Sequence, residues 1–301
     1  MERNIQRYTT RDGYNVEYSI VGQGEPVLIM HGGHSNCQEE LGYRELMENG
    51  YAVITPSRPG YGTTSKELGA DLIAACEAYL ELLDELRIRQ VHIIAISAGG
   101  PSGILFASRY PERVQSLILQ SAVSGTWLTP EDKLYKSAQI MFRPSHEKYL
   151  WGIIRLINNL FPSFLFNSMI ASFSQLNTKQ VLLQINGEDR RQFRSMLNRQ
   201  RSGHGFLIDL VLTGQDLTSV LSGIQCPTLL MHSIHDASVP MNQARIAAHR
   251  HIPNAQLCEL DSWGHLIWLG EGATGMFQQL FAFLDTVKQQ EISSVNQLET
   301  L

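Results

Sequence analysis

The sequence contains little of what marks secreted or membrane-spanning proteins. Only four of its 301 residues are cysteine and none forms a CxxC pair, so we expect reduced thiols rather than a disulfide framework. The first residues, MERNIQRYTTRDG, include no apolar run of the kind that a secretory signal contains. The most apolar stretch, Leu150–Phe173, is interrupted by Arg155 and Pro162, which argues against a membrane span. We therefore expect a cytoplasmic protein with no integral membrane segment.

An excess of charge of one sign is also missing. The formal net charge is −5 and the pI is about 6.1, which argues against a nucleic-acid partner. No basic face accompanies Leu150–Phe173 in the sequence, so a role for this stretch at a membrane surface is disfavoured. What remains, with 43% hydrophobic and 18% charged residues, is the composition of an ordinary globular protein. The sequence leaves the oligomeric state open.

Short apolar runs alternate with amphipathic segments along much of the chain. Two alternating runs, Ile5–Thr10 and Asn15–Val21, flank Arg11-Asp12-Gly13 and predict a hairpin. The further predicted strands are Val27–Met30, Ala52–Thr55, Val91–Ile96, Val114–Gln120, Pro227–His232 and Ala255–Leu260. The predicted helices are Arg44–Asn49, Leu68–Leu83, Gly99–Tyr110, Asn242–His251 and Ala273–Gln289. This alternation predicts an α/β fold, with a mostly parallel, twisted sheet that helices cover on both faces.

The alternation stops in the middle of the chain. Between residues 123 and 223 the apolar periodicity is helical throughout, which predicts an inserted helical subdomain. The expected domains are an α/β core of residues 1–122 and 224–290, a helical insertion of residues 123–223, and a polar C-terminal tail of residues 291–301. A chain of this length can bury roughly 75% of the surface that it exposes when unfolded, so it needs no disulfide or metal for stability.

The junction between Val91–Ile96 and the next helix carries a serine with small neighbours. Ser97 is flanked by Ala95, Ala98 and Gly99, and a nucleophile on so sharp a strand-to-helix turn needs small residues two positions away on each side. The usual pattern is Gly-x-Ser-x-Gly, and alanine at its first position is a departure that the sterics can tolerate. The pattern by itself is weak, because such a serine can also cap the following helix.

Two further residues strengthen the assignment of Ser97. Asp236 and His265 each come directly after a predicted strand of their own. The carboxyl ends of parallel strands meet at one edge of the sheet, so these three side chains are expected to lie together. Their order along the chain, Ser, Asp and then His, is the order expected for this kind of fold. Asp261, just before His265 in the sequence, is the second candidate for the acid.

These side-chain types are what hydrolysis through a covalent intermediate requires. A serine hydroxyl is a poor nucleophile at neutral pH, and an imidazole can take its proton and later return it to the leaving group. A carboxylate fixes the tautomer of the imidazole and stabilises the imidazolium. We therefore predict Ser97 as nucleophile, His265 as base and Asp236 as the residue that orients His265.

A glycine pair follows the strand Val27–Met30, in the segment His31-Gly32-Gly33-His34. A tetrahedral oxyanion needs preorganised donors, typically the N–H after the nucleophile and one N–H from the loop after this strand. The backbone N–H groups of Gly33 and Ala98 are therefore the predicted oxyanion hole. Close in sequence to these groups are the candidate pocket residues His34, Ser35 and Trp263.

Taken together, these motifs resemble those of the α/β-hydrolase superfamily. The resemblance is carried by His31-Gly32-Gly33, Pro59-Gly60-Tyr61-Gly62, Ser97 with its small neighbours, Tyr110-Pro111-Glu112-Arg113-Val114, Asp236 before Val239-Pro240, and Gly264-His265. It implies that the insertion is a cap over the active site and that neither a metal nor an organic cofactor is needed. Many members have an aspartate at the position of Ser57, a departure that is remote from the triad. A serine at position 97 argues against the epoxide-hydrolase and haloalkane-dehalogenase branches, which use an aspartate there.

Metal ligation is the alternative reading of the paired histidines. The pairs are His31 with His34, His232 with His235, and His249 with His251. None of them lies in HExxH or a comparable ligand set, so we predict no metal site.

Three functions are compatible with these residues, each with a small molecule as partner. The first is hydrolysis of a small, partly apolar carboxylic ester or related acyl compound, which the large apolar side chains of the insertion favour. The second is another reaction on the same triad: carbon–carbon bond, amide or N-terminal peptide hydrolysis, acyl transfer, or cofactor-free oxygen chemistry. The third is a small-molecule receptor with slow turnover. Resemblance of fold does not select among them.

Overall fold

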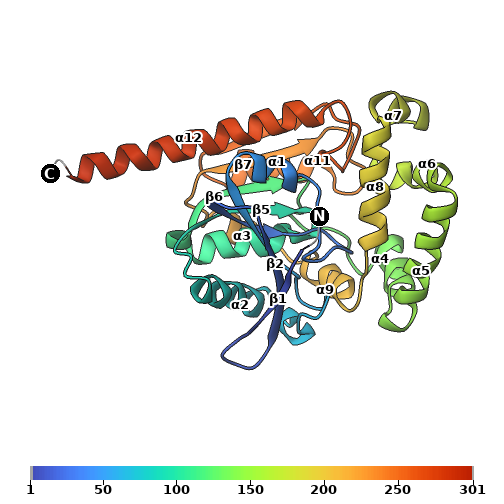
Figure 1. The fold of residues 1–301 in the computed structure, drawn as a ribbon, viewed down its shortest axis with the longest axis horizontal. Coiled ribbons are helices and arrows are strands. Elements are labelled where there is room, and N and C mark those ends of the chain that lie inside the picture. The colour runs from blue at the N-terminus through green and yellow to red at the C-terminus, as the bar shows by residue number, and fades with distance from the viewer. Residues whose placement is uncertain (1–2, 300–301) are drawn as a thin grey trace.

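The computed structural model describes residues 3–299, and these residues fold around an eight-stranded sheet (Figure 1). The strands are β1 (Ile5–Thr9), β2 (Asn15–Val21), β3 (Glu25–Met30), β4 (Tyr51–Pro56), β5 (Val91–Ile96), β6 (Val114–Gln120), β7 (Thr228–Ser233) and β8 (Ala255–Leu260). Their order across the sheet is β1-β2-β4-β3-β5-β6-β7-β8. The pairs that involve β2 are antiparallel and all the others are parallel. The predicted mostly parallel sheet is confirmed.

Helices cover both faces of the sheet, because alternate residues of each strand point to opposite faces. The core helices are α1 (Tyr43–Glu48), α2 (Leu72–Glu85), α3 (Gly100–Arg109), α11 (Met241–Ile246) and α12 (Ala273–Glu299), with the short turns η1 (Lys66–Gly69), η2 (Ser97–Gly99), η3 (Pro111–Arg113) and η4 (Ala247–His251). In β5, Ile94 shares a buried cluster with residues of α1 and α12, and Ile93 shares one with residues of α2, α3 and α11. A strand buried on both faces is therefore mostly apolar: β5 is buried throughout, and its one polar residue, His92, has ring nitrogens 2.8 Å from Ser116 Oγ and 3.1 Å from Glu25 Oε1.

Several helices differ from the sequence prediction in their bounds, and the predicted helix Asn242–His251 is divided into α11 and η4. The predicted helix Leu68–Leu83 is divided, because the Asp71 side chain accepts the N–H of Ala74 and starts α2 there. At the other end of the chain, α12 continues to Glu299, so most of the segment predicted as a polar tail from residue 291 is helical. Residues 290–299 contain neither glycine nor proline, and nothing in them ends a helix. The last two residues of the predicted tail lie outside the described residues.

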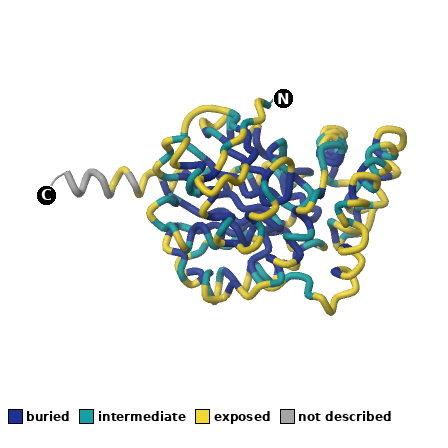
Figure 2. The backbone as a smooth tube through the Cα atoms, turned by 90° about the horizontal axis from the view of Figure 1, so that it is seen from below, coloured by how far each residue is buried: buried dark blue, intermediate teal, exposed yellow. Residues whose placement is uncertain are grey.

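The chain between β6 and β7 is helical. Its helices are α4 (Lys133–Met141), α5 (Pro144–Leu160), α6 (Pro162–Phe173), α7 (Thr178–Gln184), α8 (Gly187–Arg199), α9 (Gly205–Leu212) and α10 (Thr218–Leu221). Helix α8 lies between the sheet and the outer pair α5 and α6 (Figure 1). Figure 2 shows this insertion beside the core, with a larger exposed share along its outer helices. On its inner side Phe166 and Phe193 share a buried cluster with Trp263 and Leu266 of the core.

The apolar residues of the insertion do not form a bilayer-spanning element. In the described part of the chain, no helix combines the length and the hydropathy that crossing a membrane requires.

Candidate active site

Ser97 lies on the sharp turn between β5 and α3, at the carboxyl edge of the sheet. Its φ of +50° is in the left-handed region, which a non-glycine residue occupies only when the surrounding structure enforces it. The chain packs so closely here that positions 99 and 100, which follow Ala98, must be glycines. A Cβ atom at Gly99 would collide with the Met30 carbonyl group, and one at Gly100 would collide with the carbonyl group of Val123.

The alanine at the first position of this turn has a structural explanation in Gly103. A Cβ atom at Gly103 would lie 2.6 Å from the Cβ atom of Ala95, which is far inside the van der Waals distance. The missing side chain on α3 thus provides the room that a glycine at position 95 would otherwise provide. The departure from the usual pattern leaves the backbone of the turn intact.

Ser97, His265 and Asp236 form a continuous chain of hydrogen-bond distances. His265 Nε2 lies 3.0 Å from Ser97 Oγ, and His265 Nδ1 lies 2.7 Å from Asp236 Oδ2. Asp236 and His265 are buried, with relative exposures of 1% and 6%, whereas Ser97 is partly exposed. The geometry allows the hydroxyl to donate to Nε2 while Nδ1–H donates to the carboxylate. The structure therefore brings together the three residues that the sequence singled out.

The carboxylate of Asp236 is held by backbone donors as well. Its Oδ1 atom accepts the N–H groups of Ser238 and Val239 at 2.7 and 2.9 Å. Burial alone would raise the pKa of Asp236, but the charge of His265 and hydrogen bonds from His232 and His265 outweigh burial and lower this pKa. Asp236 is consequently ionised at neutral pH, as a group that stabilises an imidazolium must be.

His232 is a contact of this carboxylate that the sequence analysis missed. Its Nε2 atom lies 3.1 Å from Asp236 Oδ2 and 2.9 Å from the Val239 carbonyl oxygen, and the side chain is 1% exposed. The sequence pattern suggests only one role for His232, that of a metal ligand paired with His235. The available signal was the position of His232 at the end of β7, shortly before Asp236 in the sequence.

Asp261, the second candidate for the acid, lies outside this chain of contacts. Its side chain is 84% exposed and pairs with His235 at 3.0 Å. The structure therefore places Asp236, and not Asp261, against His265.

The insertion reaches both the acid and the base through the end of α6. The carbonyl oxygen of Phe173 accepts the N–H of His265 at 2.8 Å and that of Ala237 at 3.3 Å. A Cβ atom at Gly264 would collide with this carbonyl group. The residue before the base is therefore a glycine because the insertion approaches it so closely.

The two residues after Phe173 extend this contact. Ser174 Oγ donates to the Trp263 carbonyl oxygen, and Gln175 Nε2 donates to the Asp236 carbonyl oxygen at 2.8 Å. Ser174 and Asp236 also form an antiparallel bridge. We refer to these contacts as the strand-end junction, which joins residues 173–175 to residues 235–237 and 263–265.

The glycine loop after β3 lies against the nucleophile turn. A Cβ atom at Gly32 would lie 3.3 Å from Ser97 Cβ, and one at Gly33 would lie 3.9 Å from Ala98 Cβ. The predicted oxyanion-hole residues, Gly33 and Ala98, are thus neighbours beside Ser97. The other neighbour of Gly33 is the Phe206 ring of α9, 3.4 Å from the same hypothetical Cβ atom.

A buried ion pair connects this loop to the insertion. The guanidinium of Arg58 binds both carboxylate oxygens of Asp209 on α9, and the two side chains are 3% and 2% exposed. The Tyr61 hydroxyl donates to Asp209 Oδ2 at 2.6 Å. Burial would lower the pKa of Arg58, but the charge of Asp209 and its hydrogen bonds with the guanidinium together outweigh burial and raise this pKa. In this ion pair, each partner compensates the buried charge of the other.

The same residues hold the backbone of the glycine loop. Arg58 Nε donates to the His31 carbonyl oxygen at 2.7 Å, and the Arg58 N–H donates to His31 Nε2 at 2.9 Å. The N–H of His34 donates to the Tyr61 hydroxyl at 3.2 Å. Burial, with repulsion by Arg58 added, lowers the pKa of His31 well below its usual value. We refer to this set as the glycine-loop junction, which comprises His31, His34, Arg58, Tyr61 and Asp209.

His34 enters a group of aromatic side chains from the insertion. Its ring centroid lies 3.9, 4.4 and 5.2 Å from those of Phe206, Phe142 and Trp151. Burial, followed by repulsion from Arg58, lowers the pKa of His34 to about 3. A neutral histidine and three aromatic rings thus form an apolar wall beside Gly33.

The other two predicted pocket residues have partners inside the protein. Ser35 Oγ donates to Glu39 Oε2 at 2.7 Å. Trp263 is 1% exposed, and its ring centroid lies 6.2 and 6.4 Å from those of Phe166 and Phe173. Both side chains therefore contribute to the packing of the loops that carry them.

The histidine pairs do not converge on a ligand set. Within residues 3–299, no three His, Cys, Asp or Glu side chains lie close enough together to hold a metal ion.

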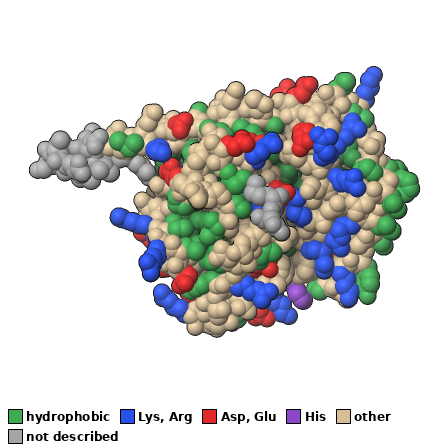
Figure 3. Space-filling view, viewed as in Figure 1, with side chains coloured by type: hydrophobic (Ala, Val, Ile, Leu, Met, Phe, Trp, Pro, Cys, Tyr) green, Lys and Arg blue, Asp and Glu red, His purple; other side chains and the backbone are tan. Residues whose placement is uncertain are grey.

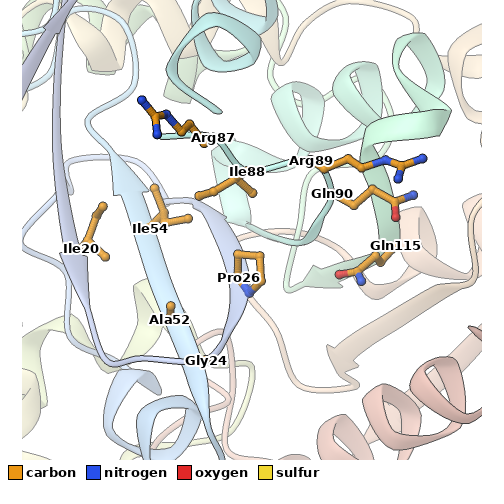
Figure 4. A pocket seen from close by; sticks show the side chains of 10 residues that line it. All are labelled: Ile20, Gly24, Pro26, Ala52, Ile54, Arg87, Ile88, Arg89, Gln90 and Gln115. Carbon is orange, nitrogen blue, oxygen red and sulfur yellow. The ribbon is translucent and has the colours of Figure 1, made fainter. Parts of the chain in front are cut away.

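A cavity of about 450 Å³ lies away from this site. It is lined by Pro26, near the start of β3, by Ala52 of β4 and by residues 87–90 before β5 (Figure 4). The guanidinium groups of Arg87 and Arg89 extend away from each other (Figure 4). Ser97 and His265 follow the carboxyl ends of their strands, so this cavity at the amino ends is separate from them.

Comparisons with known proteins agree with the fold. A family model described as alpha/beta hydrolase fold matches residues 25–271. "Uncharacterized hydrolase YcgS" of Bacillus subtilis (strain 168) is 52% identical over 286 residues, which cover 95% of this chain and 100% of that protein. A 2-hydroxy-6-oxo-6-phenylhexa-2,4-dienoate hydrolase of Burkholderia cepacia is 24% identical over 263 residues, 84% of this chain and 85% of that protein.

A solved structure shows the same architecture over nearly the whole chain. It is an alpha/beta hydrolase fold protein from Nakamurella multipartita, with a TM-score of 0.79 and 26% identity over 93% of this chain and 99% of that one. The family match covers most of the chain, and the relatives are hydrolases by name. The chain therefore belongs to the α/β-hydrolase-fold family of enzymes.

Proposed function

We propose that the protein is a serine hydrolase in which Ser97 is the nucleophile, His265 the general base and Asp236 the residue that orients His265. The observation that carries the proposal is the pair of distances, 3.0 Å from Ser97 Oγ to His265 Nε2 and 2.7 Å from His265 Nδ1 to Asp236 Oδ2. His265 removes the proton of Ser97 as its oxygen attacks the acyl carbon, and later gives this proton to the leaving group. Water then cleaves the acyl-serine by the same route.

The oxyanion hole in this proposal consists of the Ala98 and Gly33 N–H groups. Support comes from their positions on the nucleophile turn and on the adjacent glycine loop. Donors that are fixed before the reaction stabilise the developing charge without reorganisation. The glycine-loop junction, through Arg58 and Tyr61, fixes the loop that carries Gly33.

The substrate we propose is a small, partly apolar carboxylic ester or related acyl compound. Phe142, Trp151 and Phe206 surround the neutral His34 beside Gly33, and such a wall favours an apolar group. All three rings come from the segment of residues 123–223, which acts as the cap in this proposal. The enzyme would work without a cofactor and in the cytoplasm, where the four free cysteines remain reduced.

Carbon–carbon bond hydrolysis is the alternative that the comparisons favour. The Burkholderia cepacia relative is a hydrolase of 2-hydroxy-6-oxo-6-phenylhexa-2,4-dienoate by name. The same Ser97, His265 and Asp236 would serve both reactions. The fold and the triad are the same for both reactions, so only the identity of the substrate distinguishes them.

The test is hydrolysis of nitrophenyl esters of increasing acyl length by the wild type and by Ser97→Ala. We expect turnover by the wild type and a loss of about 10⁶-fold in kcat in the variant, because the triad acts as a unit. Ser124→Ala is the matched control, because in the described structure the buried Ser124 hydroxyl has no hydrogen-bond partner. Equal activity of Ser97→Ala and the wild type would overturn the nucleophile assignment. Turnover of a dienoate but of no ester would move the proposal to the carbon–carbon alternative.

A further inference from the structure

The outer surface of the insertion carries a stripe of large apolar side chains. Six of them, each between 57% and 66% exposed, are Tyr149, Ile153, Leu156, Leu160, Phe161 and Phe164. The first four recur at intervals of three and four residues on α5, which places them on one face of that helix. The last two continue the stripe into α6. Single exposed apolar residues are ordinary, whereas a contiguous exposed set marks an interaction surface.

The opposite face of α5 is already occupied. Glu147, Trp151 and Asn158 are buried; the Asn158 amide donates to the Arg194 carbonyl oxygen on α8 at 2.9 Å. The stripe therefore points away from α8 and from the catalytic core, on the outer side of the molecule where α5 and α6 lie (Figures 1 and 2). Nothing in the packing of the monomer requires these side chains to be apolar.

The charge around the stripe is strongly positive. Residues 133–201 contain eleven Lys and Arg but only three Asp and Glu, in a chain whose net charge is −5. Figure 3 shows Lys and Arg side chains gathered over the insertion, with hydrophobic side chains at its outer edge. Glu147 is buried against Arg201, and Glu188 pairs with Arg191.

Several of these bases are available to an external partner. Across the described residues, Lys133, Lys136, Arg143, Lys148 and Lys179 are exposed and belong to no ion pair. The exposed acidic residues next to α4, Glu131 and Asp132, precede that helix. The sequence analysis found no basic face beside the apolar stretch because these bases come from α4, α7 and the flank of α5.

We propose that this surface docks the enzyme on a lipid bilayer with anionic headgroups. Apolar side chains of a surface helix enter the boundary between headgroups and acyl chains, and the surrounding bases are attracted to anionic lipid. A second copy of the chain fits less well, because a symmetric contact through this face would bring its positive charges together. The inference concerns attachment and is independent of the reaction at Ser97.

The test is co-sedimentation of the wild-type protein with large vesicles of phosphatidylcholine and phosphatidylglycerol in a 3:1 ratio. Vesicles of phosphatidylcholine alone serve as the comparison. We expect binding to the anionic vesicles that weakens as salt is added, and a partition coefficient at least about tenfold lower in Ile153→Ser/Leu156→Ser. Lys148→Glu should weaken binding to anionic vesicles about fivefold.

Matched controls come from elements of the α/β core. Ile73→Ser on α2 and Lys66→Glu on η1 also change exposed side chains, and neither should alter vesicle binding. Unchanged hydrolysis of a soluble ester by the double variant would show that it is folded. Absence of binding to anionic vesicles, or equal binding by the double variant, would overturn the proposal. So would a dimer in sedimentation velocity that the double variant abolishes, because the stripe would then be a protein interface.

Discussion

The two junctions that hold the insertion to the catalytic edge use different chemistry. The strand-end junction relies largely on the backbone, above all on the Phe173 carbonyl group that His265 and Ala237 share. The glycine-loop junction relies on side chains, with the buried Arg58–Asp209 pair at its centre. Every residue type has a carbonyl group, whereas few can replace a buried ion pair. The strand-end junction should therefore tolerate most changes of side chain but no added volume. The glycine-loop junction should be disrupted when one of its charges is removed.

Asp236 is the exception on the strand-end side, because its side chain is part of the proposed chemistry. Asp236→Asn should lower kcat/KM by about 10⁴-fold, since an amide does not hold His265 in the required tautomer. The measurement is ester hydrolysis at neutral pH. Asp261→Asn is the matched control; its exposed contact with His235 should change activity less than about twofold. A larger loss in Asp261→Asn than in Asp236→Asn would transfer the acid role.

Asp209→Ala tests the side-chain dependence of the glycine-loop junction. It leaves the Arg58 charge buried without a partner, so we expect the free energy of unfolding to fall by about 3–5 kcal/mol. Urea unfolding measures the effect, and Glu188→Ala, which breaks exposed contacts with Arg191 and Gln192, should cost less than about 1 kcal/mol. The double replacement Arg58→Met/Asp209→Leu should recover much of the loss. Equal stability of Asp209→Ala and Glu188→Ala would contradict the central role of the pair.

Gly264→Ala tests the sensitivity of the strand-end junction to volume. The added methyl group would collide with the Phe173 carbonyl group and displace His265. A displacement of about 1 Å should lower kcat/KM by about 10²-fold. Gly275→Ala on α12, where a Cβ atom meets nothing within 4 Å, is the control and should retain full activity. Wild-type activity in Gly264→Ala would show that the junction yields without moving the base.

His34→Asn gives the smallest expected effect and concerns acid sensitivity. The pKa of His34 is about 3 in the folded protein, below the ordinary 6.5, so the unfolded chain binds a proton between these values and the folded one does not. Stability associated with neutral His34 is therefore present above pH 6.5 and lost as the pH falls toward 3. Between about pH 7 and 5 the wild type should lose about 2 kcal/mol more than the variant.

Urea unfolding at several pH values measures this difference. Asparagine suits the position because it tolerates the left-handed backbone at residue 34, where φ is +62°. Lowered stability at every pH would reflect lost packing against Phe206, so the slope with pH is the informative quantity. Equal slopes in the two proteins would contradict a buried, neutral His34.

The sequence by itself determined the α/β core and the edge at which Ser97, Asp236 and His265 meet. A strand buried on both faces must be largely apolar, as β5 is apart from His92, and a tight turn requires small residues such as Gly99. Both patterns appear within short stretches of the sequence, so composition and periodicity report them directly. The same local rules explain why the end of α12 was misplaced, since a helix without a stop signal simply continues.

Only the tertiary structure decided which groups support that edge. His232 contacts Asp236 because the chain turns back on itself after β7. Asp209 contacts Arg58 although the two residues are far apart in the sequence. Phe173 contacts the catalytic edge through its carbonyl group, which every residue has. The residue type at position 173 therefore could not predict this contact. Periodicity tells which face of a helix is buried, but the partner of that face depends on how all the helices pack together.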